Sequence, residues 1–350
     1  MPPDSPRDAV LLINFGEPET PEPDAVVDFL ERIFLANAAL EDPADPMAAA
    51  RRSRELAERR APALLEDYRR IGGSPLARQA REQAAGLAAA LERRGQSIPV
   101  ELGMQFTDPS IPRALETLAD RGVDRIIAFP VYPLCGPSTT VRALTDVADA
   151  LHRMDWSPEV SEITGWHRHP GYLGVRAAAI REAAVEAGVD LASPHVALAF
   201  CAHGTPLRYV EAGSRYVDYV EDWCARLAEA VGVDGYALGY QNHANRGIEW
   251  TAPDIESAID GLAGRDGVLV DAVSFVHEQS ETLVELDIDL REHAEARGLS
   301  FTRVPIRHAT DAFCDVLADL VELAAGADVE GIPALRACRC RPGAGVCFNG

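Results

Sequence analysis

The alternation of short apolar segments with longer helix-forming segments is the feature that most constrains the fold of this chain. The apolar segments are rich in β-branched residues, which is typical of strands buried on both faces. They lie at residues 9–14, 100–106, 125–131, 195–201, 236–241 and 268–276, with a shorter one near Phe301. Strands that alternate with helices in this way form parallel sheets. The sequence therefore predicts an α/β fold.

The alternation divides into two similar halves that meet near residue 165. A chain of 350 residues is too long for one simple core and suits two α/β domains. We expect an N-terminal domain over residues 1–165, a C-terminal domain over residues 166–325 and a Cys-containing tail over residues 326–350. A cleft between the two domains is then the expected place for a site.

Polar and aromatic side chains follow many of the predicted strands. In open α/β sheets, binding sites lie beyond the carboxyl ends of the strands. The residues in these positions are Asn14, Gln105, Tyr132, His203, Gln241 and His277. They are the first candidates for a functional site.

A row of acids follows the strand predicted at 268–276. Ser280 is a candidate helix N-cap, and Glu281, Glu285 and Asp289 then recur every four residues. With 3.6 residues per turn, such side chains form a row about 6 Å apart. A solvated helix face is the ordinary explanation, but leucines flank the row on one side and β-branched residues on the other. We therefore expect these acids to line a cleft.

His203 ends a predicted strand, and its small neighbours Ala202 and Gly204 let a bulky ligand approach the imidazole. A lone histidine in such a position is more often structural. Because His203 and the acid row both follow strands of the same half, they can face the same cleft. A metal-binding histidine with carboxylates fits this combination best. The acid row could then conduct a cation inward or protons outward.

The composition excludes several classes of protein. A net charge of −22 and a pI of about 4.8 argue against binding to nucleic acid or to an anionic membrane surface. None of the 33 basic residues is a lysine, which excludes Schiff-base chemistry and a Walker A loop. No GxSxG or GxGxxG signature is present. Without a long apolar run or signal-peptide character at the N-terminus, we expect a cytoplasmic protein with no transmembrane segment.

Three cysteines crowd into the Gly/Pro-rich tail, at Cys338, Cys340 and Cys347. In a reducing compartment, such thiols favour ligation of a metal or a cluster over disulfides. Zinc is the generic alternative to an iron–sulfur cluster, and in either case a fourth ligand has to come from elsewhere in the fold. The remaining cysteines lie in or beside apolar segments, where a buried free thiol is expected.

The chain resembles the ferrochelatases, which insert Fe²⁺ into a porphyrin in haem synthesis, over about residues 8–320. Each motif that carries the resemblance is weak alone, but together they are highly specific. The motifs are LINFGEPET at 12–20, YRRIGGSPL at 68–76, Tyr132-Pro133 with STT at 138–140, AHGTP at 202–206, YQ at 240–241, Trp250, and SFV at 274–276 with ETLVELDI at 281–288.

This resemblance implies two Rossmann-like domains of the chelatase type around a porphyrin cleft. His203 matches the family's site histidine, which binds incoming metal or takes pyrrole protons, and Glu281 matches the carboxylate opposite it. Glu285 and Asp289 match the line of acids that leads away from that carboxylate. We expect His203 and Glu281 to face each other across a slot wide enough for a flat tetrapyrrole.

The resemblance also implies a set of porphyrin-binding residues. Phe15 falls where the family places an apolar residue against the face of the macrocycle, and Tyr132 and Trp250 fall in segments that line the pocket. Protoporphyrin IX and coproporphyrin III both remain open as the substrate, because they differ in the propionates that the protein has to hold.

The chain departs from the family pattern beside the metal site. Gln279 stands where a histidine is usual, and His277, two residues earlier, is a candidate replacement. Gln105 stands where many members have an arginine. These departures concern propionate binding and proton transfer, and they leave His203 and Glu281 intact.

The tail resembles that of the ferrochelatases that carry a [2Fe-2S] cluster. In those proteins a Cys-x-Cys pair and a later cysteine join one distant cysteine in the loop that follows Tyr-Pro. The resemblance implies Cys135, Cys338, Cys340 and Cys347 as the ligands here. Four thiolates are the usual number for such a cluster, which would join the tail to the body of the protein.

Two other functions fit the same fold. One is a chelatase for another divalent metal such as cobalt, although the motifs at 68–76 and 281–288 favour iron insertion. The other is a non-catalytic porphyrin or haem carrier that kept the cleft. Anaerobic incubation with Fe²⁺ and porphyrin separates a carrier from an enzyme, because a carrier binds without metalation.

Overall fold

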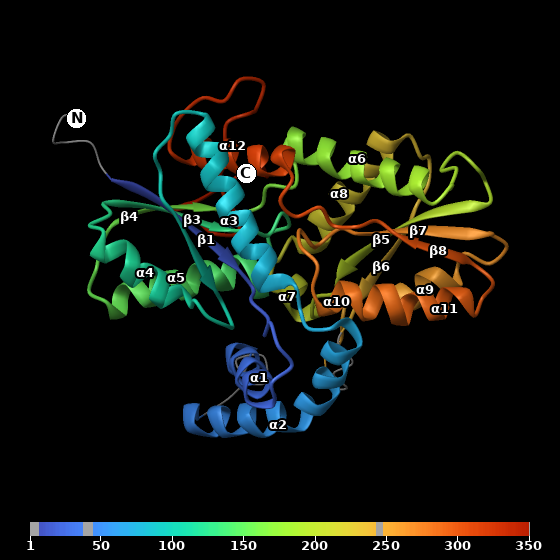
Figure 1. Cartoon of the computed structure of the whole chain (residues 1–350), viewed down its shortest axis with the longest axis horizontal. Coiled ribbons are helices and arrows are strands. Elements are labelled where there is room, and N and C mark those ends of the chain that lie inside the picture. The colour runs from blue at the N-terminus through green and yellow to red at the C-terminus, as the bar shows by residue number, and fades with distance from the viewer. Residues whose placement is uncertain (1–6, 38–44, 243–247, 350) are drawn as a thin grey trace.

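The strands of the first half join into one parallel sheet. In the computed structural model, which describes residues 7–37, 45–242 and 248–349, this sheet has its strands in the order β2-β1-β3-β4-β10-β9 (Figure 1). The four strands from the first half, which pair in parallel, are β1 (Asp8–Asn14), β2 (Val100–Met104), β3 (Arg125–Pro130) and β4 (Glu159–Ile163). The alternation of the sequence thus gives the predicted parallel pairing.

The tail completes this first sheet. β10 (Gly345–Cys347) pairs in parallel with β4, and β9 (Arg336–Ala337) pairs antiparallel with β10. The sequence did not predict β4, β9 or β10. β9 and β10 are too short to show a period, and β4 reads EVSEI, in which polar residues occupy three of the five positions.

The second half forms a separate four-stranded parallel sheet, in the order β6-β5-β7-β8. Its strands are β5 (Val196–His203), β6 (Ala237–Gln241), β7 (Gly267–Ala272) and β8 (Ser300–Arg303). The predicted fold class, α/β with parallel sheets flanked by helices, is confirmed. The predicted domain boundary at residue 165 stays a prediction, although the two sheets do divide between β4 and β5.

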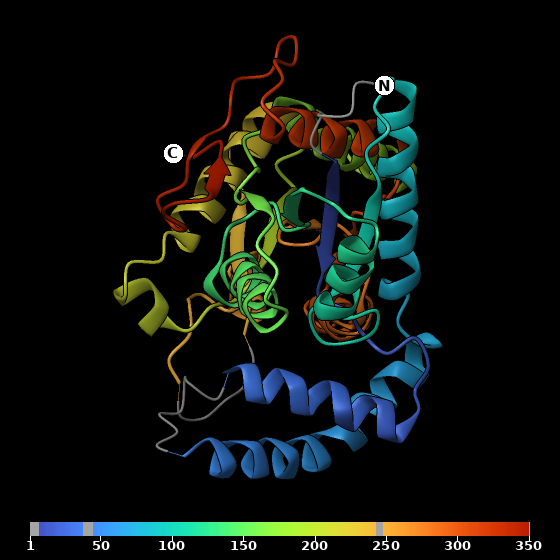
Figure 2. The same ribbon diagram turned by 90° about the vertical axis from the view of Figure 1, so that its left-hand side faces the viewer.

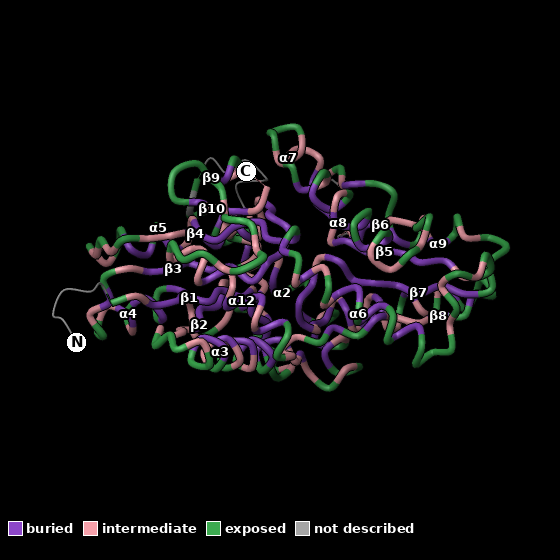
Figure 3. The backbone as a smooth tube through the Cα atoms, turned by 90° about the horizontal axis from the view of Figure 1, so that it is seen from above, coloured by how far each residue is buried: buried purple, intermediate pink, exposed green. Residues whose placement is uncertain are grey.

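Alternate residues of the strands pack on opposite layers of helices. Leu11 of β1 belongs to the apolar cluster that includes α4 (Ile111–Asp120) and α5 (Arg142–Arg153). Its neighbour Leu12 belongs to the cluster that includes α3 (Leu76–Arg93). Figure 3 shows the central strands of both sheets buried between their helices.

One apolar cluster extends across both sheets. It contains Phe129 of β3 and Phe200 of β5, both fully buried, together with residues of α6 (Pro170–Glu186), α8 (Tyr216–Val231) and α12 (Asp311–Ala324). α12 contacts α3 of the first half as well as α6 of the second. Shared packing of this kind fixes the two sheets relative to each other.

α1 (Pro23–Asn37) and α2 (Pro46–Ile71) pack against each other and stand away from the sheets (Figure 2). α2 runs through the first part of the motif at 68–76 and ends at Ile71. Tyr68 is fully buried against α1, so tertiary packing extends the helix, and Gly72, at φ +75°, ends it in the left-handed conformation.

None of the helices in the described residues has the length and apolar character of a membrane span.

The remaining elements are short. The short elements are α7 (Leu207–Glu211), α9 (Ile255–Asp260), α10 (Ser280–Leu283), α11 (Arg291–Glu295) and two π-helical turns, Pro137–Val141 and Glu285–Leu290.

Candidate functional site

The structure brings His203 and Glu281 into direct contact, although 78 residues separate them in the sequence. His203 is the last residue of β5, and Glu281 lies on α10, which follows the neighbouring strand β7. The His203 Nε2 lies 3.1 Å from Glu281 Oε1. Their side chains are 32% and 20% exposed, so the pair is sheltered but reachable.

The predicted slot between these two side chains is wrong. A flat tetrapyrrole needs about 3.5 Å of clearance on each of its faces, whereas the two side chains are only 3.1 Å apart. A macrocycle therefore cannot lie between them. His203 and Glu281 present themselves together, on the same side of any ring that binds beside them.

Electrostatics make this contact an ion pair. Burial disfavours the charged imidazole, but the Glu281 carboxylate outweighs burial and raises the pKa of His203 to about 9. The His203 Nδ1 lies 2.7 Å from the carbonyl oxygen of Gly204, so Nδ1–H donates there and Nε2–H donates to Glu281. At neutral pH the imidazole beside this carboxylate is therefore protonated.

The backbone of His203 is held on both sides. Its N–H donates to Ser274 Oγ at 3.0 Å, and the Tyr216 hydroxyl donates to its carbonyl oxygen at 3.0 Å. Tyr216 also hydrogen-bonds Ser274 at 2.9 Å. The ring of Phe275 meets the imidazole edge-on at 6.3 Å. The imidazole thus projects from a backbone with fixed hydrogen-bond partners.

Gln279 positions the Glu281 carboxylate. The sequence predicts Ser280 as the N-cap of the helix, but Gln279 is the N-cap and forms a capping box with Thr282. The side-chain amide of Gln279 donates to Glu281 Oε2. His277 is only 3% exposed, and burial lowers its pKa to about 4. Gln279, and not His277, therefore occupies the place beside Glu281.

Glu285 and Asp289 of the acid row lie on a π-helical turn, where the sequence predicts regular α-helix. The Asp289 N–H bonds the carbonyl oxygen of Val284 at 2.9 Å, a spacing of five residues. The extra residue per turn arises from tertiary packing, because the composition of the segment is that of an ordinary helix. The predicted apolar flanks are buried at Leu286 and Leu290.

The exposure of the acids increases along the row from Glu285 to Asp289. Glu285 accepts a hydrogen bond from Gln241 at 3.0 Å, and burial, together with the neighbouring Glu281, raises its pKa to about 7. The Asp289 side chain is half exposed and pairs with Arg70 of α2 at 2.7 Å. Arg70 was not singled out from the sequence, because only the fold brings α2 to the outer end of the row.

Glu17 is a second residue that the sequence did not indicate. It is 5% exposed and lies in the loop after β1. Its carboxylate accepts from the Ser280 backbone N–H at 3.1 Å, from the Ser280 hydroxyl and from Ser74 Oγ at 2.5 Å. Burial raises its pKa. In the sequence Glu17 reads as a turn residue between Gly16 and Pro18, so only long-range packing shows its burial.

The predicted porphyrin-binding residues also lie at the carboxyl edges of the strands. Phe15 follows β1 and packs against Phe106, with ring centroids 4.6 Å apart. Tyr132 follows β3, and its hydroxyl donates to Gln105 Oε1 at 2.6 Å. Trp250 forms a β-bridge with Pro206, in the loop that follows His203. Two of the three thus follow strands of the first sheet, and the third pairs with the loop after β5 of the second.

The four predicted cluster cysteines come together. The thiols of Cys135, Cys340 and Cys347 donate to the sulfur of Cys338 and lower its pKa, while the contacts with Cys338 and Cys340 raise the pKa of Cys135. All four thiols are free. Tyr219 OH lies 3.2 Å from the Cys340 sulfur. Over the described ranges, no set of three or more His, Cys, Asp or Glu side chains is arranged for a single metal ion.

The model of the ferrochelatase family matches residues 7–325. A ferrochelatase from Geobacter sp. (strain M21) is 31% identical over 329 residues, which cover 92% of this chain and 99% of the relative. A ferrochelatase from Synechococcus elongatus is 33% identical over 335 residues, which cover 90% of this chain and 82% of the relative.

Similar solved structures agree on the fold. SirB from Bacillus subtilis with Fe³⁺ has a TM-score of 0.51 at 15% identity, over 73% of this chain and 94% of its own. A multi-domain protein from Deinococcus radiodurans with structural similarity to chelatases has a TM-score of 0.52 at 13% identity, over 90% of this chain and 55% of its own.

Proposed function

The chain belongs to the ferrochelatase family, whose members insert Fe²⁺ into a porphyrin in haem biosynthesis, and we propose that His203 and Glu281 carry out this reaction here. The contact between His203 Nε2 and Glu281 Oε1 at 3.1 Å is the observation that carries the proposal. It supplies a nitrogen ligand, a carboxylate and a proton acceptor at one point of the site.

Iron insertion requires the removal of two protons, since the porphyrin loses two pyrrole N–H protons as Fe²⁺ enters. The His203 Nε2 carries a proton while it is paired with Glu281, and it has to pass that proton to Glu281 and on to the acid row before it can bind a metal. The incoming Fe²⁺ replaces this proton as the partner of the carboxylate. The ion pair thus keeps the metal ligands together until the substrate arrives.

The acid row receives the protons or delivers the metal. Glu285, with a pKa of about 7, changes its charge near neutral pH and lies next to Glu281. Asp289 is half exposed at the far end of the row, where it meets solvent. A buried carboxyl that titrates near the working pH is suited to pass a proton outward.

The porphyrin binds beside this pair in our proposal, against Phe15, Tyr132 and Trp250. Phe15 and Tyr132 follow strands of the first sheet, and Trp250 lies beside the loop after His203. A rigid apolar surface of this kind can bend the macrocycle and present its nitrogens. The proposal covers protoporphyrin IX and coproporphyrin III alike.

We further propose that Cys135, Cys338, Cys340 and Cys347 hold a [2Fe-2S] cluster. The donor set fits, because four free thiols converge and the three neighbours stabilise a thiolate at Cys338. When bound, the cluster attaches the tail to the loop after β3.

We also propose that the protein lies in the cytoplasm, because thiols stay free of disulfides only in a reducing compartment.

Anaerobic incubation of the purified chain with Fe²⁺ and each porphyrin tests the activity. We expect the metalloporphyrin spectrum to appear with at least one of the two porphyrins. Porphyrin binding without metalation would identify a carrier instead. Faster insertion of Co²⁺ than of Fe²⁺ would identify a cobalt chelatase.

A further inference from the structure

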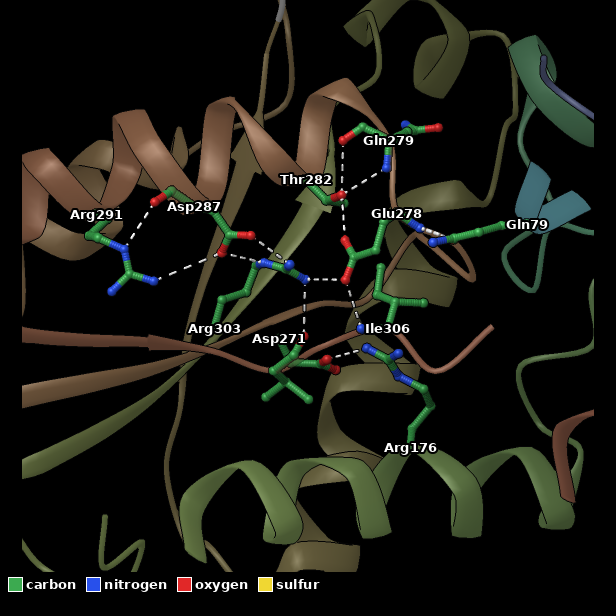
Figure 4. Close-up of polar contacts among 11 residues, drawn as sticks. Gln79, Arg176, Asp271, Glu278, Gln279, Thr282, Asp287, Arg291, Arg303 and Ile306 are labelled. Atoms are coloured by element: carbon green, nitrogen blue, oxygen red, sulfur yellow. Dashed lines mark hydrogen bonds and ion pairs between the residues drawn. The ribbon is translucent and has the colours of Figure 1, made fainter. Parts of the chain in front are cut away.

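A single buried arginine forms ion pairs with two carboxylates that lie beside the acid row. Arg303 ends β8, and its side chain is 6% exposed. The guanidinium contacts Glu278 Oε1 at 3.0 Å and both carboxylate oxygens of Asp287 at 2.7 Å (Figure 4). A planar guanidinium fixes direction as well as distance in a two-pronged contact of this kind.

Glu278 anchors the segment that leads to Glu281. Its Oε1 also accepts from the Ile306 N–H at 2.9 Å, and its Oε2 accepts from Thr282 Oγ1 at 2.6 Å. Both oxygens are therefore occupied, and Figure 4 shows the side chain pointing to Arg303 and Ile306. Glu278 thus acts as a fixed point three residues before Glu281 and is not a free base.

Asp287 anchors the helix that carries the rest of the row. It lies between Glu285 and Asp289, and residues two positions apart on a helix do not share a face. Arg303 holds Asp287 from β8, whereas Gln241 of β6 holds Glu285. β8 and β6 are the opposite edges of the sheet. The helix is thus held from both edges of the sheet. Glu285 and Asp289 lie on a different face of it from Asp287 and so point away from Arg303.

We propose that Arg303 is a positioning residue that sets the direction of the acid row through Glu278 and Asp287. The inference rests on the proposed function and deepens it. Arg303 holds Glu278, three residues before Glu281, and Asp287, between Glu285 and Asp289, so one side chain determines where the acids of the row point. Replacing such a network with apolar residues commonly preserves stability, so the network is better explained by the geometry that it imposes.

The variants Arg303→Lys, Asp287→Asn and Glu278→Gln test this inference. Lysine keeps the positive charge, but its ammonium group cannot make the bidentate contacts by which a planar guanidinium binds carboxylates. Asp287→Asn and Glu278→Gln keep Arg303 and the shape of each side chain. Each of them removes the charge of one of the two carboxylates that pair with Arg303. Arg297→Met, which removes the surface pair with Asp260 in the same half, is the matched control. Circular dichroism and thermal melting establish that each variant folds.

We expect Arg303→Lys and Asp287→Asn to lower kcat for Fe²⁺ insertion by roughly 10- to 100-fold, because a small displacement of the reacting groups is costly. The KM for porphyrin should stay within about twofold, since the anchors do not touch the macrocycle. Titration of Co²⁺ alone into the substrate-free protein should show binding weakened by about tenfold, with an altered ligand-field spectrum. Glu278→Gln should change both readouts in the same direction.

The outcomes separate this inference from the proposed function. If all three variants fold and keep the kcat and Co²⁺ affinity of the Arg297→Met control, Arg303 is merely structural and the inference is overturned. A loss of melting temperature with unchanged activity per folded molecule leads to the same conclusion. A wild-type chain that binds Co²⁺ yet never inserts Fe²⁺ counts against the proposed function, and the Co²⁺ titration of the variants still tests the positioning role.

Discussion

At the scale of single residues, the pair of His203 and Glu281 determines the chemistry of the site. The Glu281 carboxylate raises the pKa of the imidazole, and the imidazole in turn donates a hydrogen bond to the carboxylate. The opposite charges of the two groups lower the cost of holding them in a partly buried place. Both residues could be predicted because each follows a strand within a recognisable motif.

Glu281→Gln should lower the pKa of His203 from about 9 towards its ordinary value of 6.5, because the amide carries no charge. Insertion of Fe²⁺ should slow by about 100-fold or more, since both a ligand and a proton acceptor are altered. Titration by NMR of histidine-labelled protein measures the first effect, and anaerobic kinetics measure the second. Glu292→Gln, at an exposed acid of α11, should change neither.

The same pair makes stability depend on pH. The pKa of His203 is raised on folding, so its contribution is fully present below pH 6.5 and is lost as the pH rises through about 9. We expect His203→Asn to cost about 1 to 2 kcal/mol more at pH 6 than at pH 9.5, after allowance for screening by water. Urea unfolding at the two pH values measures the difference. Equal costs at both would show that the imidazole is not charged in the folded state.

Glu17→Ala should destabilise the protein by about 2 to 3 kcal/mol, because it leaves the Ser280 N–H and two hydroxyls without an acceptor in a buried place. Glu17→Gln keeps an acceptor and should retain most of that stability. Glu19→Ala is the matched control, since Glu19 forms a surface pair with Arg81. Should the two alanine variants unfold at the same urea concentration, Glu17 is not the link that its contacts indicate.

At the scale of elements, the strands with a continuous apolar run were predicted, and those defined by long-range pairing were not. The strands of the second sheet were predicted within two residues, because their central parts are buried, except that β7 ends at Ala272, four residues before its predicted end. β9 and β10 exist only because β4 provides an edge. The π-helical turn at Glu285–Leu290 could not be predicted either, since nothing in the composition distinguishes it from an α-helix.

The contact between α2 and the π-helical turn predicts an effect on iron entry. Arg70→Gln removes the cation that pairs with Asp289, so the outer end of the row becomes more negative. We expect the KM for Fe²⁺ to fall by about two- to threefold at low salt and the effect to shrink with added salt. Stability should change by less than about 1 kcal/mol, since the pair is partly exposed. Arg69→Gln, which loses an exposed pair with Glu66, is the control.

At the scale of the whole molecule, one apolar cluster joins the two sheets, and the tail joins the first sheet. The shared packing explains how residues from distant parts of the sequence keep fixed distances at the site. The family resemblance predicted that the two halves enclose a site. It did not predict that Glu17 of the first half would bind Ser280 of the second, because that contact depends on the final packing of both halves.

Cys338→Ser should abolish the visible absorption expected of the proposed cluster and loosen the tail, because Cys338 contacts all three other thiols. Cys314→Ser is the matched control, since Cys314 is buried on α12, away from the tail. Absorption after anaerobic purification, iron analysis and limited proteolysis of the tail measure the effect. A wild-type chain without cluster absorption, or a Cys338→Ser chain that retains it, contradicts the four-thiolate proposal.

The pairing of β10 with β4 has a consequence for synthesis on the ribosome. The strand that completes the first sheet is made of residues 345–347, which are translated long after β4. Until then the outer edge of β4 stays open, and open strand edges recruit other chains. A nascent polypeptide must therefore protect this edge until residues 345–347 emerge to cover it, so the first sheet is completed after the second.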